Sequence, residues 1–175
     1  TMLTIAMIIG AALAVLFIYA ATRPDTFRVQ RTAVINASPE KVFACINDLH
    51  HWASWSPWER KDPAMKKSHS GSPQGTGAVL EWDGNKDVGT GRMEVLESIP
   101  SSMILIKLDF FKPFEAHNTA EFTLGPRAGS TEVTWTMYGP QPYMMKVMGF
   151  FCSPDKMVGK DFEAGLTNLK MLVEK

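Results

Sequence analysis

The sequence has little cysteine, no excess of either charge and no cluster of basic residues. Its 175 residues include two cysteines, 18 basic side chains and 18 acidic ones. Binding to nucleic-acid phosphates depends on clustered Lys and Arg. The densest basic pair is Lys66-Lys67, which an ordinary solvated loop explains. We therefore expect no nucleic-acid partner.

Metal-binding and cofactor-binding motifs are also missing from the sequence. Cys45 and Cys152 belong to no C-x-x-C or Cys/His pattern. The adjacent pair His50-His51 lacks the spacing that brings two ligands to one face of a helix or strand. There is no nucleophile elbow and no phosphate-binding loop. We expect no metal ion and no cofactor, whereas a disulfide between the two cysteines is left open.

The one long apolar run stands at the N-terminus, where residues 2–21 contain no charged side chain. A helix of about 20 residues rises about 30 Å, which matches the hydrocarbon core of a bilayer. A cleaved secretory signal is the alternative, because small residues lie near the end of the run. Signals, however, normally begin with positive charge and have a shorter apolar stretch. We predict a transmembrane anchor over residues 2–21.

Basic residues come after this run and none precedes it. Arg23, Arg28 and Arg31 lie on its C-terminal side, so the positive-inside rule places the C-terminal part of the chain in the cytoplasm. Pro24 disfavours helical backbone at Arg23, and residues 22–26 are therefore predicted to be a linker. Residues 27–175 have the length of one domain. We expect a single-pass membrane protein with a cytoplasmic soluble domain.

Strand and helix patterns succeed one another in the predicted domain, which indicates the α+β class. Residues 27–35 alternate apolar and polar side chains as a strand does. Ser38-Pro39-Glu40 then has the features of a helix start. Further strand candidates are residues 78–83, 91–98, 103–111, 116–124 and 131–138. Their short connections imply an antiparallel meander. Residues 50–77 lack such a pattern and are rich in turn formers and tryptophan.

A long amphipathic helix is predicted at the end of the chain. Ser153-Pro154-Asp155 repeats the earlier start signal. Apolar residues then recur at spacings of three and four: Val158, Phe162, Leu166, Leu169 and Val173. Such a stripe must pack on a partner of equal length, and the concave face of a curved antiparallel sheet is the natural one. We predict that the helix lies lengthwise across the sheet and leaves room beneath it.

Several short motifs carry a resemblance to a known superfamily. Ile35-Asn36-Ala37-Ser38-Pro39-Glu40-Lys41-Val42-Phe43 resembles the opening of the SRPBCC superfamily, which holds START domains, pollen-allergen-like proteins and polyketide cyclases. Six further segments resemble the bacterial polyketide cyclase/dehydrase branch of this superfamily. They are residues 52–58 (Trp-Ala-Ser-Trp-Ser-Pro-Trp), 75–77, 89–91, 113–114, 129–135 and 161–170. The resemblance covers nearly all of residues 27–174. It implies a helix-grip fold with a cavity between sheet and long helix, but no single reaction.

The predicted ligand-binding residues are mostly aromatic or methionine. They are Trp55, Trp58, Trp82, Phe110, Phe114, His117, Trp135, Met145 and Met148. The loop tryptophans either form an aromatic lip at the cavity mouth or hold a long loop against the sheet. The Met-rich segment 143–151 either gates the pocket, dips toward the membrane surface or fills the core.

Acid/base chemistry has few candidates on the predicted sheet. Glu81, Asp83, His117 and Glu121 are the residues on sheet positions that a catalyst could use, with His117, Glu81 and Glu121 as the first choices. Solvent-facing positions on a half-exposed sheet explain them without any chemistry. We expect a membrane-anchored module that binds a hydrophobic small molecule or lipid. The alternative is a cyclase- or aromatase-like enzyme, and a third possibility is an interaction module with a collapsed cavity. A START-type pocket should measure roughly several hundred Å³, so cavity size discriminates among these hypotheses.

Overall fold

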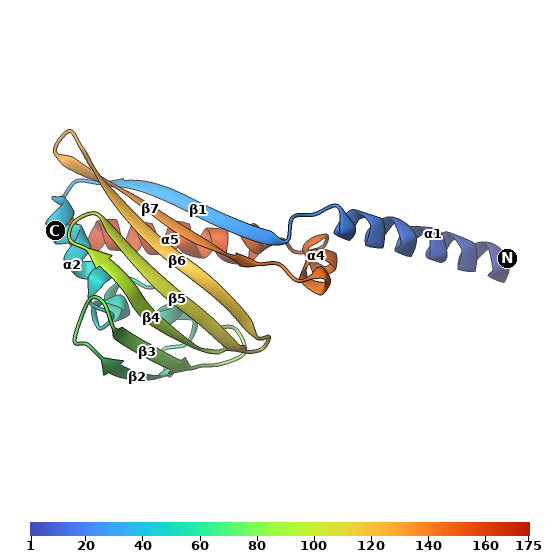
Figure 1. Ribbon diagram of the computed structural model, residues 1–175, viewed down its shortest axis with the longest axis horizontal. Coiled ribbons are helices and arrows are strands. Elements are labelled where there is room, and N and C mark those ends of the chain that lie inside the picture. Colours follow the sequence, from blue (N-terminus) through green and yellow to red (C-terminus); the bar gives the residue numbers. More distant parts are fainter.

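A seven-stranded antiparallel sheet curves around one long helix in the computed structural model, which describes residues 1–175 (Figure 1). The strands are β1 (Thr26–Ile35), β2 (Lys66–Gly71), β3 (Ala78–Asp83), β4 (Thr90–Ile99), β5 (Met103–Lys112), β6 (Ala116–Arg127) and β7 (Ser130–Pro140). They lie in the order β1-β7-β6-β5-β4-β3-β2, and all neighbours are antiparallel. The predicted α+β helix-grip fold is confirmed.

The helices are α1 (Met2–Ala21), α2 (Pro39–Asn47), the 3₁₀ turn η1 (His51–Ser54), α3 (Trp58–Lys61), α4 (Tyr143–Gly149) and α5 (Pro154–Val173). Two of them, α2 and α5, begin at the caps that the sequence predicts. The hydroxyl of Ser38 accepts a hydrogen bond from the Lys41 amide, and that of Ser153 accepts one from the Lys156 amide. In both helices proline occupies the first turn, where its missing N–H costs nothing.

Strand β2 was not predicted. It pairs with β3 from Lys66↔Asp83 to Gly71↔Ala78, and all of its residues are exposed. An edge strand without apolar side chains has no hydrophobic alternation to reveal it. Strand β2 is held by backbone pairing with β3 and by polar side-chain contacts such as the 2.6 Å hydrogen bond from Lys67 to Glu59. The tryptophan-rich stretch 50–77 thus holds one strand and two short helical turns.

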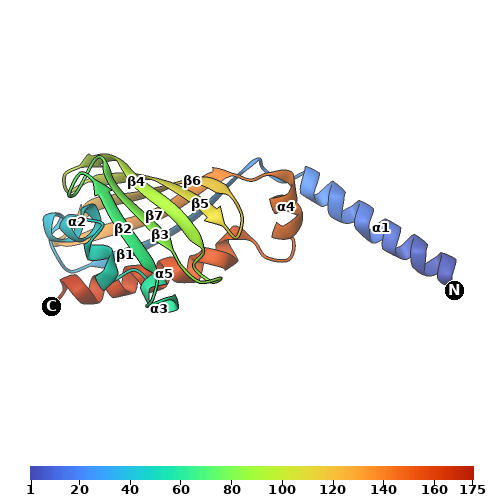
Figure 2. The same cartoon turned by 90° about the horizontal axis from the view of Figure 1, so that it is seen from below.

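Helix α5 lies lengthwise along the concave face of the sheet (Figure 2). Its predicted stripe faces inward, with Phe162, Leu166, Leu169 and Val173 each at most 2% exposed. Arg31 of β1 fixes its first turns, since the guanidinium donates to Asp155 at 2.8 Å and to Glu163 at 2.6 Å. Sheet and helix therefore enclose a single hydrophobic core.

Helix α1 stands away from this core, and at its base it contacts α4 (Figures 1 and 2). It is long and apolar enough to cross a membrane, and none of its most apolar stretch is buried in the protein. A signal sequence near the N-terminus can also meet these requirements of length and apolarity, so either identity fits the helix itself. Cys45 and Cys152 are both free.

Candidate functional site

An apolar cavity lies between the concave face of the sheet and α5. Fifteen of its 17 lining residues are hydrophobic, and the other two are Ser56 and Glu59. Its volume is about 80 Å³. Pockets that enclose drug-sized ligands measure roughly 300–1,000 Å³, so the cavity is smaller than a START-type pocket, and in this conformation its size is the one expected for a collapsed cavity. Core side chains fill most of the space between helix and sheet.

Alternation along the strands directs the lining side chains inward. Leu80 and Trp82 come from β3, Phe110 from β5 and Ala120 from β6. The rings of Trp82 and Phe110 meet edge to face with centroids 5.8 Å apart. A side chain at Gly91 of β4 would collide with the Trp82 ring, which explains a glycine in the middle of a sheet. The wall is thus made of rigid rings on rigid strands.

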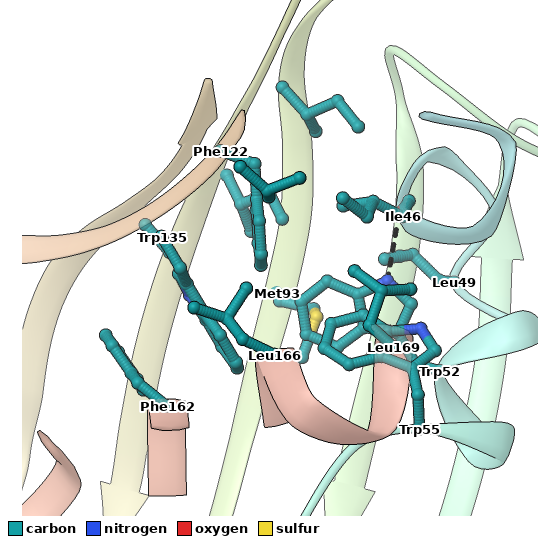
Figure 3. Packing of buried hydrophobic residues seen from close by; sticks show 14 of the residues in the cluster. Ile46, Leu49, Trp52, Trp55, Met93, Phe122, Trp135, Phe162, Leu166 and Leu169 are labelled. Atoms are coloured by element: carbon teal, nitrogen blue, oxygen red, sulfur yellow. Dashed lines mark hydrogen bonds between the residues drawn. The ribbon is translucent and has the colours of Figure 1, made fainter. Parts of the chain in front are cut away.

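Two further lining residues, Trp135 and Phe162, belong to a stack of aromatic rings (Figure 3). Trp135 of β7 lies between Phe122 of β6 and Phe162 of α5, with centroid distances of 4.8 Å and 4.1 Å. All three side chains are at most 2% exposed. The indole N–H of Trp135 is buried and has no hydrogen-bond partner. Trp135 therefore brings one unpaired buried donor to a lining whose other polar side chains are Ser56 and Glu59.

The loop tryptophans mainly hold the chain after α2 against the sheet. The indole N–H of Trp52 donates to the Ile46 carbonyl at 2.9 Å (dashed in Figure 3), and that of Trp55 donates to the Cys45 carbonyl at 3.2 Å. The Asn168 amide of α5 donates to the Trp55 carbonyl at 3.0 Å. These bonds favour the structural interpretation of Trp55, whereas Trp52 and Trp58 also line the cavity.

Four of the predicted ligand-binding residues lie in the cavity lining: Trp58, Trp82, Phe110 and Trp135. The other five lie outside this lining. Trp55 is buried in the core beside the cavity, and Phe114 is 68% exposed in the turn between β5 and β6. Met145 and Met148 belong to α4, outside the sheet. His117 alternates with the inward-facing Asn118 and Ala120, so its side chain points to the convex face.

The acid/base candidates share that convex face. The side chains of Glu81 and His117 are 55% and 59% exposed, and Glu121 alternates with buried Phe122. His117 contacts Asp109 at 2.8 Å and Glu115 at 3.2 Å, and these hydrogen bonds raise its pKa. None of the three lines the cavity, so a substrate held there would not reach them.

The polar residues of the lining were missed because they lie on the irregular chain between α2 and β2. Ser56 is 9% exposed, and the Glu59 carboxylate accepts a 2.6 Å hydrogen bond from Lys67 of β2. Met65 from the same stretch and Met93 from β4 also line the cavity. The inward position of Met93 follows from the alternation of its strand, which the sequence shows. No periodic pattern indicates the positions of Ser56, Glu59 and Met65.

Comparisons with known proteins agree with this architecture. Residues 26–174 match the model of the family described as polyketide cyclase/dehydrase and lipid transport. No curated protein matches the sequence. Among solved structures, protein CV1439 from Chromobacterium violaceum is 19% identical over 87% of this chain and 99% of its own, with a TM-score of 0.60.

Two further structures come from biosynthetic systems. The di-domain ARO/CYC StfQ from the steffimycin biosynthetic pathway is 10% identical over 85% of this chain and 51% of its own, with a TM-score of 0.64. DynU16, a putative protein in the dynemicin biosynthetic locus, is 19% identical over 87% of this chain and 48% of its own, with a TM-score of 0.59. These likenesses concern the fold. The family match covers most of the sequence, and the chain belongs to the polyketide cyclase/dehydrase and lipid transport family.

Proposed function

We propose that the domain binds an apolar small molecule or a lipid chain in the cavity between sheet and α5. The observation that carries this proposal is the lining, in which 15 of 17 residues are hydrophobic. Such a surface favours a ligand through the removal of apolar area from water, worth about 25 cal/mol per Å². It offers little to a charged substrate.

A cavity of about 80 Å³ must widen to admit most ligands of this class. Met65, Met93 and Met137 all line it, and methionine side chains change rotamer more readily than branched or aromatic ones. Widening can thus proceed by rearrangement of these side chains while the rings of Trp82 and Trp135 stay in place. The size of the ligand would be set by how far the methionines can move.

The unpaired indole N–H of Trp135 adds one polar preference. A buried donor without an acceptor carries a desolvation cost of about 1–3 kcal/mol. A ligand that presents a carbonyl or hydroxyl oxygen to this N–H would remove the cost. We therefore favour ligands that are apolar but carry an acceptor, such as a ketone, over pure hydrocarbons.

Helix α1 would anchor this domain to a membrane, with residues 22–26 as the linker and residues 27–175 as the binding domain. Its 20 residues carry no charge, and their exposure in the folded chain leaves an apolar surface that a bilayer would cover. The arginines after α1 favour a cytoplasmic domain. A lipid-soluble ligand would then be drawn from the same membrane.

A cyclase-like reaction is the second candidate, favoured by the likeness to the di-domain ARO/CYC StfQ. The acid/base groups would have to be Ser56 or Glu59, because these are the polar side chains of the lining. Glu59 is engaged by Lys67, which reduces its availability to a substrate. A Glu59→Gln variant and a Ser56→Ala variant that both keep ligand binding and any observed turnover would eliminate this route.

Thermal unfolding of the detergent-solubilised chain tests the binding proposal. A ligand at 100 times its Kd stabilises the folded state by about 2.7 kcal/mol, which raises the Tm of a domain this size by several degrees. Ala120→Leu fills the cavity and should abolish the shift, whereas Thr119→Leu on the convex face should retain it. If ring ketones, fatty acids and membrane lipids all leave the Tm unchanged, the proposal fails.

A further inference from the structure

We propose that α4 and the turn after it lie in the membrane surface beside α1 and hold the domain against the bilayer. The segment exposes Tyr143, Met144, Met148, Phe150 and Phe151, here called the α4 patch, and these side chains are 44–71% exposed. The proposal rests on the proposed function in one respect, because α1 must be a membrane span. It adds a second contact between the protein and the membrane, in which lipid covers the α4 patch.

The α4 patch is unusually apolar for a surface in contact with water. Residues 141–152 (Gln-Pro-Tyr-Met-Met-Lys-Val-Met-Gly-Phe-Phe-Cys) contain no acidic side chain and one basic side chain. Exposed apolar residues gathered in one place mark surfaces that a partner or a membrane covers. The core of the domain does not include these five residues, so the fold itself does not account for them.

Contacts with α1 set the depth of the patch. Tyr143 stacks on Phe17 with centroids 6.4 Å apart and donates to the Phe17 carbonyl at 3.0 Å, and Phe150 meets the edge of Tyr19 at 5.3 Å. Phe17 precedes the last helical residue, Ala21, by about 6 Å along the axis. Interfacial helices insert about 5–10 Å into the headgroup and acyl boundary. If α1 leaves the bilayer near Ala21, α4 lies at that depth.

The basic side chains nearest α4 are engaged in contacts of their own. The Nζ atom of Lys146 is paired with Asp25 of the linker at 2.5 Å, and the lysine side chain is 7% exposed. Its hydrogen bond also holds the pKa of Asp25 low. Arg23 lies over the ring of Tyr19, with its guanidinium 4.2 Å from the centroid. Tyrosines beside a basic residue at the end of a span are typical of a membrane interface.

The linker is tied to the same element, which excludes a loosely tethered domain. The Gln141 amide donates to the Asp25 carbonyl at 2.7 Å, directly before α4 begins. Together with the Lys146–Asp25 pair, this bond places α4 at the base of α1 (Figures 1 and 2). Committing α4 to the bilayer would therefore fix the tilt of the whole domain.

Cys152 provides a site for the test, because it is exposed and directly follows Phe151. The full chain with Cys45→Ala carries an environment-sensitive fluorophore on Cys152 and is reconstituted into phosphatidylcholine vesicles. Lipid with a nitroxide near the top of its acyl chain should quench the emission, as expected for a probe at interfacial depth. The matched control adds Cys152→Ser and moves the label to Ala128→Cys, in the turn between β6 and β7 at the opposite end of β7.

Three outcomes are informative. Lipid quenching at position 152 without quenching at position 128 supports the proposal. The double substitution Met144→Glu and Phe151→Glu should then reduce the lipid quenching at position 152. Vesicle flotation with equal iodide quenching at both positions overturns the α4 proposal and leaves the anchor intact. Failure of the chain to float with vesicles overturns the anchor and the α4 proposal together. Ligand-induced Tm shifts in detergent are measured separately, so loss of the binding function is distinguishable from all three.

Discussion

Trp135 of β7 and Phe162 of α5 lie face to face, with ring centroids 4.1 Å apart and ring planes 5° apart. The pair connects the sheet to the helix at the cavity wall. Phe122 stacks on the other face of Trp135 at 4.8 Å, so three elements meet in one column of rings. Both stability and cavity shape should depend on this column.

Replacing Phe162 by alanine should destabilise the domain by about 3–5 kcal/mol, the usual cost of removing a buried phenylalanine. All five tryptophans lie in residues 52–135, so tryptophan fluorescence during urea unfolding in detergent reports on the domain without α1. Phe114→Ala is the control, because Phe114 is 68% exposed and its loss should change stability by less than about 0.5 kcal/mol. Similar losses for both variants would contradict the packing described here.

Gly165 should not tolerate alanine, although alanine is the better helix former by about 1 kcal/mol. A Cβ atom there would meet Trp135 Cζ3 at 2.7 Å and Pro57 Cδ at 3.2 Å. Overpacking of this kind costs about 1–3 kcal/mol. Gly159→Ala on the same helix should lose less, because the atoms in its way belong to the flexible Arg31 side chain. Equal unfolding midpoints for the two variants would show that Trp135 can move aside.

Much of the fold was predictable because its elements carry strong periodic signals. The stripe on α5 and the alternation of β5, β6 and β7 gave both the elements and their inward faces. Strand β2 escaped because Lys66–Gly71 has no apolar residue, and its position depends on backbone pairing with β3. A strand that is held by backbone pairing with another segment shows no periodic hydrophobic pattern in its own sequence when its side chains are all polar.

The site was predicted less well, and the reasons differ between residues. The outward position of His117 can be deduced from the inward position of Phe122 five residues later, so the signal was present in the sequence. Ser56 and Glu59 enter the lining from an irregular segment that no period describes. The small volume of the cavity depends on the packing of every lining side chain at once.

Stability should depend on pH through His117. Hydrogen bonds that the imidazole of His117 donates to the Asp109 and Glu115 carboxylates raise its folded pKa above the ordinary 6.5, so the folded state binds the proton more tightly than the unfolded state does. The stabilisation of the folded state by protonated His117 is therefore complete below about pH 6.5 and is lost as the pH rises through the folded pKa. The Tm difference between wild type and His117→Gln should shrink from pH 5.5 to pH 8.5, pH values chosen to span roughly this titration. A Tm difference that stays constant over this pH range would exclude a contribution of His117 protonation to stability.

The free indole N–H of Trp135 predicts a preference between two ligands of nearly equal shape. Acetophenone carries a carbonyl oxygen that ethylbenzene lacks. Trp135→Phe removes the donor, so it should weaken acetophenone binding relative to ethylbenzene by about 1 kcal/mol, the usual worth of one hydrogen bond, or roughly fivefold in Kd. Titration of both ligands against both proteins measures this difference. Because the smaller ring changes the cavity for both ligands alike, only the ratio of the two Kd values is diagnostic. An unchanged ratio would mean that the donor does not face the ligand.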